Sequence, residues 1–497
     1  MATIKILSHQ DLQQIHAESL KILSEIGIRV PNQMLLDIFK KKGARVDFSK
    51  EIVKIPAKLV NRVIGQAVDR QSTYYSRNSN ASTRLTPLRG WMSEANLSSV
   101  FDYSTNSARK ATLREMLYGI VLGNSLENIE RVSCLVIDED FGKHAPIINY
   151  YLLNLFSEKR YFIGAIDTLN SAKCIIQMAR VIAEDETQLR NGRLAEFELE
   201  AANNLEFSKT HLDIAFEFAK NRMKILPGGW FWMGYHSPMT FASAISLSNA
   251  NILAAMVVTM LINPETIFFD YLFGTQSVGE KDDSSPLFGS PNQAIFSIVG
   301  RQLADFYGFK KCITNTGLSD SVQNDFQSGF ERGVTAALAI AAGVNQIGLQ
   351  GIVGADQGIS FEELIIDDEM ISYLNYIFQK DIEINEQTLK FDSIKKNGPG
   401  KRFPVLGSAT SDTIWRSRVF SSGSYSRKKN EQLFSRANLE FQNTIKRKFP
   451  PAPVVDKEQE RELNNILGKF IDRRIVSLLQ SKLGEALNQP GSEGISL

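Results

Sequence analysis

The sequence contains few cysteines and histidines and almost no net charge. It has three cysteines and five histidines in 497 residues. Cys134, Cys174 and Cys312 are widely separated, so they match neither a metal-binding spacing nor a disulfide framework, and a reducing cytoplasm is expected. The 56 basic and 55 acidic residues nearly cancel. This balance argues against nucleic acid as a partner.

Long hydrophobic runs and familiar catalytic motifs are also missing. The longest apolar stretch, residues 250–262, is too short to span a bilayer and predicts a buried helix. The N-terminus, MATIKILSHQDLQQ, lacks the apolar segment of a secretion signal, so no membrane contact is expected. There is no phosphate-binding P-loop, dinucleotide glycine motif, H-E-x-x-H or nucleophile elbow. A lyase or hydrolase that needs a metal or a Schiff-base lysine has no clear candidate residue, and no metal site is predicted.

Three regions differ in their patterns. Residues 1–71 read as helices with a hairpin at VDFSKEIVKI, which predicts an N-terminal cap. Residues 72–386 alternate β-rich runs with helical segments, which favours an α/β fold, specifically a TIM (β/α)8 barrel. Residues 387–497 are basic at first and then helical, and we expect a C-terminal extension with one last amphipathic helix after the PPAPVVD linker.

Eight short runs are the candidate strands of the barrel. The first two have no helix between them, so they are interpreted as a hairpin covering the bottom of the barrel, with missing strands elsewhere. The segment LRNGRLAEFELEAANN is expected to be a charged helix. The candidate strands are residues 72–76, 97–103, 132–138, 161–167, 224–230, 266–272, 310–315 and 345–351.

Polar residues at the ends of these runs are the first candidates for chemistry, because active sites of such barrels lie where strands lead into loops. Acidic side chains there can orient amines or act as general bases. The segment from Asn315 to Glu369 holds two such loops around a small-residue helix, so it is predicted to border the active site. The candidates are Asp102, Asp270, Asp320, Asn315 and Gln350.

Aromatic residues form the second group of candidates. The segment PGGWFWMGYHSP contains Trp230, Trp232, Tyr235 and His236, and it lines either a pocket or a packing interface. His236 is either functional or a loop histidine satisfied by the backbone. Aromatic faces with one or two carboxylates suit a quaternary ammonium group, because the ring quadrupole attracts the cation. Tyr271, next to Asp270, is added to this predicted cage.

The order and spacing of several segments resemble the trimethylamine methyltransferase (MttB-like) family. The N-terminal IHAESLKILSEIGIRV and VKIPAKLVNRVIGQA are similar to its cap. FDYSTNSARKAT, SDSVQNDFQSGFERGVTAALAIAAGVNQI and GISFEELIIDDE resemble its central segments. Gly398–Gly400 and PPAPVVDKEQERELNNIL resemble its C-terminal arm. The similarity extends over nearly the whole chain.

This resemblance implies a TIM barrel that moves a methyl group from a methylated amine to the Co(I) of a separate corrinoid protein. The chain itself would bind no cofactor, because the cobalamin arrives on the partner, and a homo-oligomer is expected. No pyrrolysine is present, so the chain resembles the pyrrolysine-free members that act on quaternary amines such as glycine betaine. Asp102, Asp270 and Asp320 would be the catalytic acids. The substrate-binding residues would be Trp230, Trp232, Tyr235, His236, Tyr271, Asn315 and Gln350.

Two positions depart from the family pattern. The family commonly has histidine where this chain has Gly348, and His-Thr where it has Ala409 and Thr410. These differences predict an altered substrate. They also keep open an alternative function, a non-catalytic paralogue that binds a cationic osmolyte or scaffolds a corrinoid protein.

Overall fold

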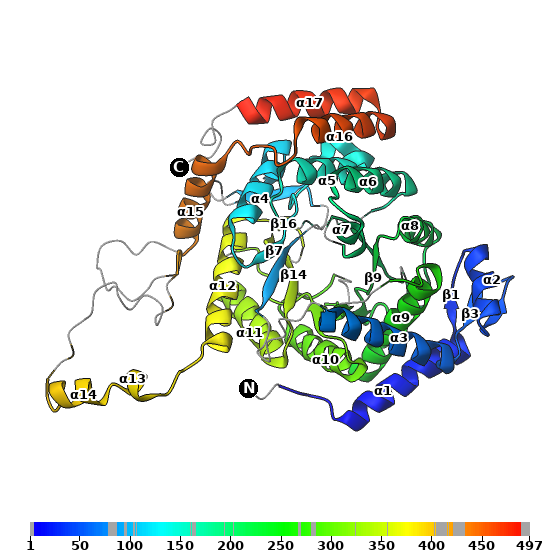
Figure 1. Cartoon of the computed structure of the whole chain (residues 1–497), viewed down its shortest axis with the longest axis horizontal. Coiled ribbons are helices and arrows are strands. Elements are labelled where there is room, and N and C mark those ends of the chain that lie inside the picture. Colours follow the sequence, from blue (N-terminus) through cyan, green and yellow to red (C-terminus); the bar gives the residue numbers. More distant parts are fainter. Residues whose placement is uncertain are drawn as a thin grey trace.

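The structure is a computed structural model in which helices surround a central group of strands (Figure 1). Ala409 and Thr410 lie outside the described residues. The described residues are 4–77, 87–93, 97–102, 105, 107–159, 161, 166–192, 194–201, 203–266, 270–279, 285–323, 325–354, 356–401, 403, 415, 417–420 and 433–488.

The N-terminal elements are three helices and a small antiparallel sheet of order β1-β3-β2. The first helix begins at a capping box, in which the side chains of Ser8 and Asp11 each accept a hydrogen bond from the backbone N–H of the other. The bounds are α1 His9–Lys21, a π-helical turn Ile22–Ile26, β1 Ile28–Arg29, α2 Gln33–Lys41, β2 Arg45–Asp47, β3 Ile52–Lys54 and α3 Ala57–Arg77.

Parallel strands form the centre of the molecule. Five of them build one sheet of order β11-β13-β14-β4-β7, and β8 and β9 form a second parallel pair. Strand β14 pairs with β4, so the last parallel strand in the chain lies beside the first. An isolated parallel bridge joins Val132, after β7, to Tyr161. The strands are β4 Arg89–Met92, β7 Ile129–Arg131, β8 Glu196–Leu199, β9 Lys224–Pro227, β11 Asp270–Leu272, β13 Lys311–Thr314 and β14 Gln346–Gln350.

The strands alternate with helices, as the sequence predicted for an α/β fold. Every ladder in these two sheets is parallel, and the hydrogen-bonded ladder of the described residues is not continuous around the strand group. The helices are α4 Leu113–Ser125, the 3-10 helix Glu139–His144, α5 Ala145–Phe156, α6 Leu169–Ile182, α7 Glu186–Arg190, α8 Lys209–Lys220, α9 Phe241–Ile262, α10 Pro291–Tyr307, α11 Phe326–Ala342 and α12 Phe361–Gln379.

Side chains alternate between the two faces of these strands. Ile225, Tyr271 and Cys312 belong to the large apolar core between the strands and the helices. Their neighbours along the chain form a separate small cluster on the opposite, inner face, where Trp230 packs against it. The members of this inner cluster are Trp91, Leu226, Leu272 and Ile313.

Helix α9 is apolar along its whole length. Among the described helices it alone is long and apolar enough to cross a membrane, but 89% of its most apolar window is buried inside the protein. It packs against the N-terminal helices and β9. The burial agrees with the predicted core helix.

Three sequence predictions about elements are wrong, and one strand was missed. Residues 132–138 were expected to be a strand, but β7 ends at Arg131 and only an isolated bridge at Val132 follows it. Residues 72–76 were expected to be a strand, but they continue α3, since no glycine or proline lies between Gly65 and the end of the helix at Arg77. The segment expected to be a charged helix holds β8, whose residues alternate between acidic and apolar. The strand β4 was not predicted at all; its four residues include a glycine and only two large apolar side chains.

The predicted hairpin between residues 72–76 and 97–103 does not form, because residues 72–76 belong to α3, and a different hairpin lies next in the chain. β5 (Ser99–Asp102) and β6 (Ser107–Lys110) pair antiparallel, and β5 also pairs with β16 (Gly358–Ile359). β16 in turn pairs with β15 (Ile352–Val353), which directly follows the carboxyl end of β14. The hairpin therefore belongs to the end of the strands where the predicted active-site loops lie.

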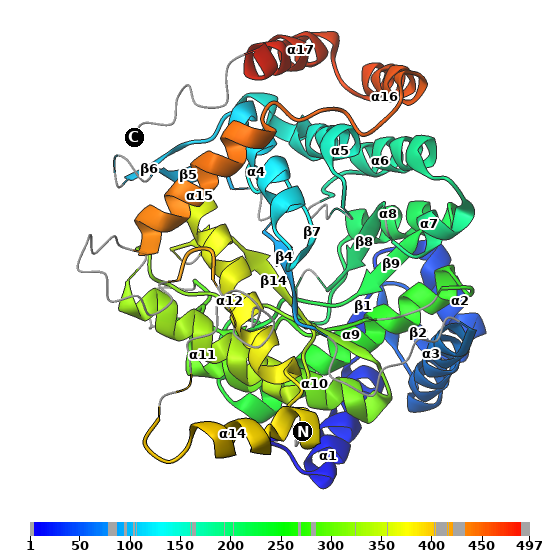
Figure 2. The same cartoon turned by 60° about the vertical axis from the view of Figure 1, so that its left-hand side comes forward.

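Two of the C-terminal helices, α13 Glu386–Leu389 and α14 Phe391–Asn397, have no buried residue and project from the rest in Figure 1. The others, α15 Leu433–Lys448, α16 Lys457–Phe470 and α17 Arg473–Asn488, pack on the outer helices (Figure 2). The tyrosine hydroxyl of Tyr151 donates to Asn464 Oδ1 at 3.0 Å, which ties α5 to α16. One amphipathic helix was predicted after the proline linker, but the chain turns at residues 471 and 472 and forms two.

Candidate functional site

A chain of buried ion pairs crosses the inner face of the strands near their amino-terminal ends. Lys224 Nζ lies 2.8 Å from a carboxylate oxygen of Glu196 and 3.1 Å from one of Asp270. Arg131 pairs with the other oxygen of Glu196, and its guanidinium lies 3.5 Å from the centre of the Trp91 ring. Burial raises the pKa of Asp270, but Lys224 and then Lys311 outweigh it, so the pKa falls below the ordinary value.

Asp270 is thus part of an ion-pair network at the amino-terminal end of β11. It is the first residue of β11 that pairs with β13. Its neighbour Tyr271 faces the other way. The Tyr271 side chain is fully buried, and its hydroxyl donates to Asn249 Oδ1 of α9 at 2.7 Å. Adjacent strand residues point to opposite faces, so Asp270 and Tyr271 cannot enclose the same cation as expected.

Trp230 lies just beyond the carboxyl end of β9 and covers the inner apolar cluster. The chain leaves room for its ring by placing Gly274 opposite it. A Cβ atom built on Gly274 would lie 2.0 Å from Cε3 of the indole. The backbone N–H of Gly274 also donates to the carbonyl of Gly229 at 3.1 Å, which fixes the two segments together. This glycine is required for the position of the indole.

Two carboxylates from β8 lie beside Trp230. The Trp230 side chain hydrogen-bonds Glu198, and its backbone N–H donates to Glu200 Oε2 at 3.3 Å. Burial raises the pKa of Glu198 well above its ordinary value, and the nearby Glu200 raises it further. Burial also raises the pKa of Glu200 to about 7, against the hydrogen bond from Trp230. This is a protonatable acid pair next to an aromatic ring.

An amide cluster extends the same region toward β13. Asn315, directly after β13, donates through Nδ2 to Gln276 Oε1 at 3.0 Å. Gln293, at the start of α10, donates to the same oxygen at 3.3 Å. All three side chains are buried. Asn315 therefore lies at the carboxyl end of its strand, as expected for a residue that lines the mouth.

Three of the predicted aromatic residues form a group of their own. The ring centres of Trp232 and Tyr235 are 5.7 Å apart, and His236 lies 5.4 Å from Trp232. Tyr235 is 61% exposed. His236 Nδ1 accepts a hydrogen bond from the backbone N–H of Trp232 at 3.0 Å, and burial lowers its pKa. This imidazole is therefore satisfied by the backbone, which was the alternative interpretation of His236.

The remaining predicted residues lie away from Trp230. Asp102, in the β5–β6 hairpin, accepts from Arg109 Nε at 2.9 Å. Asp320 accepts from the backbone N–H of Phe288 at 2.9 Å and so joins two loops. Gln350 Nε2 donates to the carbonyl of Gly348 at 2.9 Å, and its side chain lies between β4 and α12 on the outer face. The structure does not bring these three side chains together.

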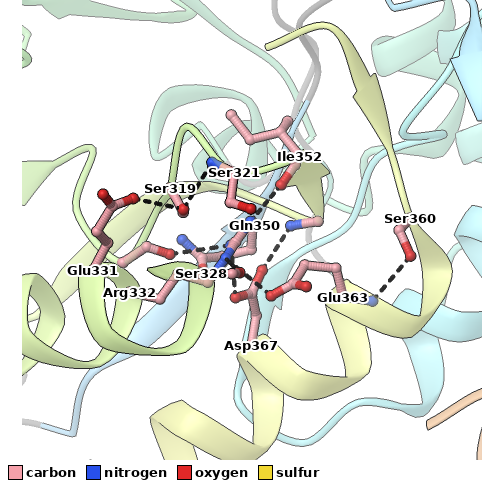
Figure 3. Close-up of polar contacts among 12 residues, drawn as sticks. Ser319, Ser321, Ser328, Glu331, Arg332, Gln350, Ile352, Ser360, Glu363 and Asp367 are labelled. Atoms are coloured by element: carbon pink, nitrogen blue, oxygen red, sulfur yellow. Dashed lines mark hydrogen bonds and ion pairs between the residues drawn. The ribbon is translucent and has the colours of Figure 1, made fainter. Parts of the chain in front are cut away.

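Figure 3 shows polar contacts made by the segment from Asn315 to Glu369, which was predicted to border the active site. Arg332 of α11 is buried, with Nε 2.9 Å from Glu363 and Nη1 3.0 Å from Asp367, both on α12. It also donates to the carbonyls of Gly317 and Ile352, which follow β13 and β14. The network holds two mouth loops and two helices in one position. This part of the segment therefore supports the site without belonging to it.

Gly348 lies on the inner face of β14. The side chain of Ile347, its neighbour, points outward beside Met370 of α12, so position 348 points inward. The residue is buried, yet a Cβ atom built on it would meet no atom within 4 Å. A small open space therefore exists inside the strand group at the position of the expected histidine.

This space gives a direct prediction about stability. Gly348→Ala is expected to leave the free energy of unfolding unchanged or to raise it by up to about 1 kcal/mol, because alanine restricts the unfolded chain. Gly119→Ala is the matched buried control, since its Cβ would lie 2.6 Å from the carbonyl oxygen of Cys134. It should destabilise by about 1–3 kcal/mol. Urea denaturation checks both, and equal destabilisation would contradict the open space.

Among the described residues no group of three or more histidine, cysteine or acidic side chains is arranged to hold a metal ion. The described residues instead bring together an indole, two carboxylates and a set of amides at the carboxyl ends of parallel strands. The sequence prediction included Trp230 and Asn315 among its candidates. It missed Glu198 and Glu200 because β8 was interpreted as a helix, although the alternation E-F-E-L-E places all three acids on one face of a strand.

The fold and the site together describe an α/β protein with aromatic and acidic groups at the ends of parallel strands. Comparison with known proteins makes the assignment specific. The family described as "Trimethylamine methyltransferase (MTTB)" matches residues 1–478. The chain therefore belongs to the trimethylamine methyltransferase family and is a methyltransferase.

Individual relatives are distant but extend over most of the chain. The glycine betaine methyltransferase of Desulfitobacterium hafniense (strain Y51) is 24% identical over 80% of this chain and 82% of its own. The trimethylamine methyltransferase MttB2 of Methanosarcina mazei is 25% identical over 94% and 95%. A crystal structure of the hydroxylamine MtmB complex aligns with 98% of this chain and 94% of its own at 9% identity and a TM-score of 0.38. That last similarity is too low to support any conclusion.

Proposed function

We propose that this methyltransferase moves a methyl group from a quaternary or methylated amine, of the glycine betaine type, to the Co(I) of a separate corrinoid protein. The observation that carries the proposal is Trp230, an aromatic ring held beside carboxylates at the carboxyl ends of the strands. An indole face attracts a cationic nitrogen without a hydrogen bond, which a fully methylated nitrogen cannot form.

The chemistry requires a good leaving group. A carbon–nitrogen bond breaks, its electron pair stays on the nitrogen, and a quaternary nitrogen leaves as a neutral amine. The cobalt of the partner supplies the electron pair of the new carbon–cobalt bond. The residues of this chain would hold the cation so that one methyl group points out of the mouth, and the buried walls would exclude water.

The same proposal includes the arrangement of the whole chain. We propose that β4, β7, the Tyr161 segment, β8, β9, β11, β13 and β14 form a closed TIM barrel within residues 72–386. Residues 1–71 would form a cap and residues 387–497 an extension that supports a cytoplasmic homo-oligomer. The pairing of β14 with β4 and the bridge at Tyr161 support closure. Light scattering of the purified chain measures the oligomeric state, and a monomer would contradict that part.

A methyl-transfer assay tests the function. The purified chain is mixed with Co(I) cobalamin and, one at a time, glycine betaine, choline, carnitine and proline betaine. The spectrum of methylcobalamin is expected to appear with at least one of them and not with 3,3-dimethylbutan-1-ol, the uncharged analogue of choline. Binding by calorimetry without methyl transfer, with free cobalamin and with several corrinoid proteins, would contradict the proposed reaction.

A further inference from the structure

The acid pair on β8 faces the interior of the strand group. Glu196, Glu198 and Glu200 alternate with apolar residues, so the three side chains point the same way. Glu196 marks that direction, because it is buried against Lys224 of β9. Glu198 and Glu200 therefore lie one and two levels above the ion-pair network, toward the carboxyl ends of the strands.

Trp230 connects the two carboxylates. Its side chain hydrogen-bonds Glu198, and its backbone N–H donates to Glu200 Oε2 at 3.3 Å. Because Gly274 leaves space for the indole on the opposite side, the ring is held in one position. An aromatic face and two acids thus meet at one point on the inner wall.

Two further observations support a ligand on this inner side of the strands. Glu198 Oε1 is buried and has no hydrogen-bond partner within the described part of the chain, although an unpaired buried oxygen is costly. Across the strand group, the buried Gly348 faces open space on the same inner side. The charged groups nearest the pair are Arg131 and Glu196, which already bind each other, and Lys224 and Asp270 one level below are likewise paired.

We propose that Glu198 and Glu200, with the indole of Trp230, form the subsite that binds the positively charged nitrogen of the substrate. This inference rests on the proposed function and names the specificity-determining residues of the same site. Burial raises the pKa of Glu198 well above its ordinary value and that of Glu200 to about 7, so the pair acquires one negative charge as pH rises through 7. One such charge is complementary to a single fixed ammonium group.

The direct test is calorimetric titration with choline and tetramethylammonium. Glu200→Gln keeps the shape of the side chain and removes the charge that the pair carries above pH 7, so it is expected to weaken binding about tenfold or more. Glu198→Gln replaces a protonated acid by a neutral amide and keeps the charge of Glu200, so it should weaken binding less. Glu158→Gln, an exposed acid on the surface, is the control and should bind as the unaltered chain does. Circular dichroism confirms that each variant is folded. Unchanged affinity in the folded Glu200→Gln variant would overturn the inference.

The unaltered chain provides a second test that needs no variant. The pKa of Glu200 is about 7, so the pair gains its negative charge as pH rises through 7. A ligand with a fixed charge should therefore bind about tenfold more tightly at pH 8 than at pH 6. The uncharged 3,3-dimethylbutan-1-ol should show no such dependence. Choline affinity that is constant between pH 6 and pH 8 would contradict the acid pair as the cation site.

The proposed reaction and the proposed cation site can be contradicted separately. If methylcobalamin forms but Glu198→Gln and Glu200→Gln bind choline normally, the enzyme is an amine methyltransferase whose cation lies elsewhere. If choline binds with the expected pH dependence but no amine gives methylcobalamin with any corrinoid protein, the acid pair is confirmed as a cation site and the proposed reaction is wrong.

Discussion

Replacing Arg332 by methionine is expected to lower the free energy of unfolding by about 3–5 kcal/mol. The guanidinium lies 2.9 Å from Glu363 and 3.0 Å from Asp367, and all three side chains are buried. Methionine fills a similar volume but leaves two carboxylates without their cation, and the carbonyls of Gly317 and Ile352 lose a donor. Urea denaturation followed by circular dichroism measures the change.

An exposed arginine provides the comparison. Arg29 binds Glu206 and Glu51 at the surface, where such pairs contribute about 1 kcal/mol or less. Arg29→Met should therefore have a small effect. If the two variants lose the same stability, the buried network does not hold the mouth loops as the distances indicate.

Replacing Trp230 by leucine is expected to weaken amine binding roughly thirtyfold, because a desolvated cation–π contact contributes about 2 kcal/mol. Leucine can still pack on the apolar residues that the indole covers, so the fold should persist. Methyl transfer should fall by at least the same factor. Calorimetry with choline and the methylcobalamin assay measure the two effects.

Trp232→Leu is the matched control for Trp230. Trp232 contacts Tyr235 and His236 in two tilted ring pairs, and among the described residues no ring contact joins this partly exposed group to Trp230. Its loss should reduce affinity less than the loss of Trp230. A larger effect of Trp232 would place the cation in the outer aromatic group instead.

The sequence was sufficient for the class of fold because its strongest signals are local. Buried runs such as residues 310–315 and 345–351 became β13 and β14, and α11 between them followed from its small residues. β4 and β8 were missed because short strands that carry glycine or acids depend on their neighbours for burial. Residues 72–76 show the opposite error, since their β propensity did not outweigh the continuing helix α3.

The site was harder to predict because it depends on which way side chains point. Asp270 and Tyr271 are adjacent in sequence and were assigned one role, yet the pleat of β11 sends one into the ion-pair network and the other into the helical core. Gln350 follows a bulge in β14, where Leu349 has a positive φ of 67°. Its side chain therefore lies on the outer face of the strand. The packing of Trp230 followed from its place between two glycines and further aromatic residues directly after a strand, whereas Tyr235 of the same segment is 61% exposed.

The most direct test of the central claim is the spectrum of cobalamin during turnover with choline or glycine betaine. The chain, Co(I) cobalamin and one amine should produce methylcobalamin, with a rate that falls strongly in Trp230→Leu and in Glu200→Gln and stays unchanged in Glu158→Gln. Methylcobalamin formation that proceeds at the same rate in all four proteins would contradict an interior cation site bordered by Trp230 and the acid pair.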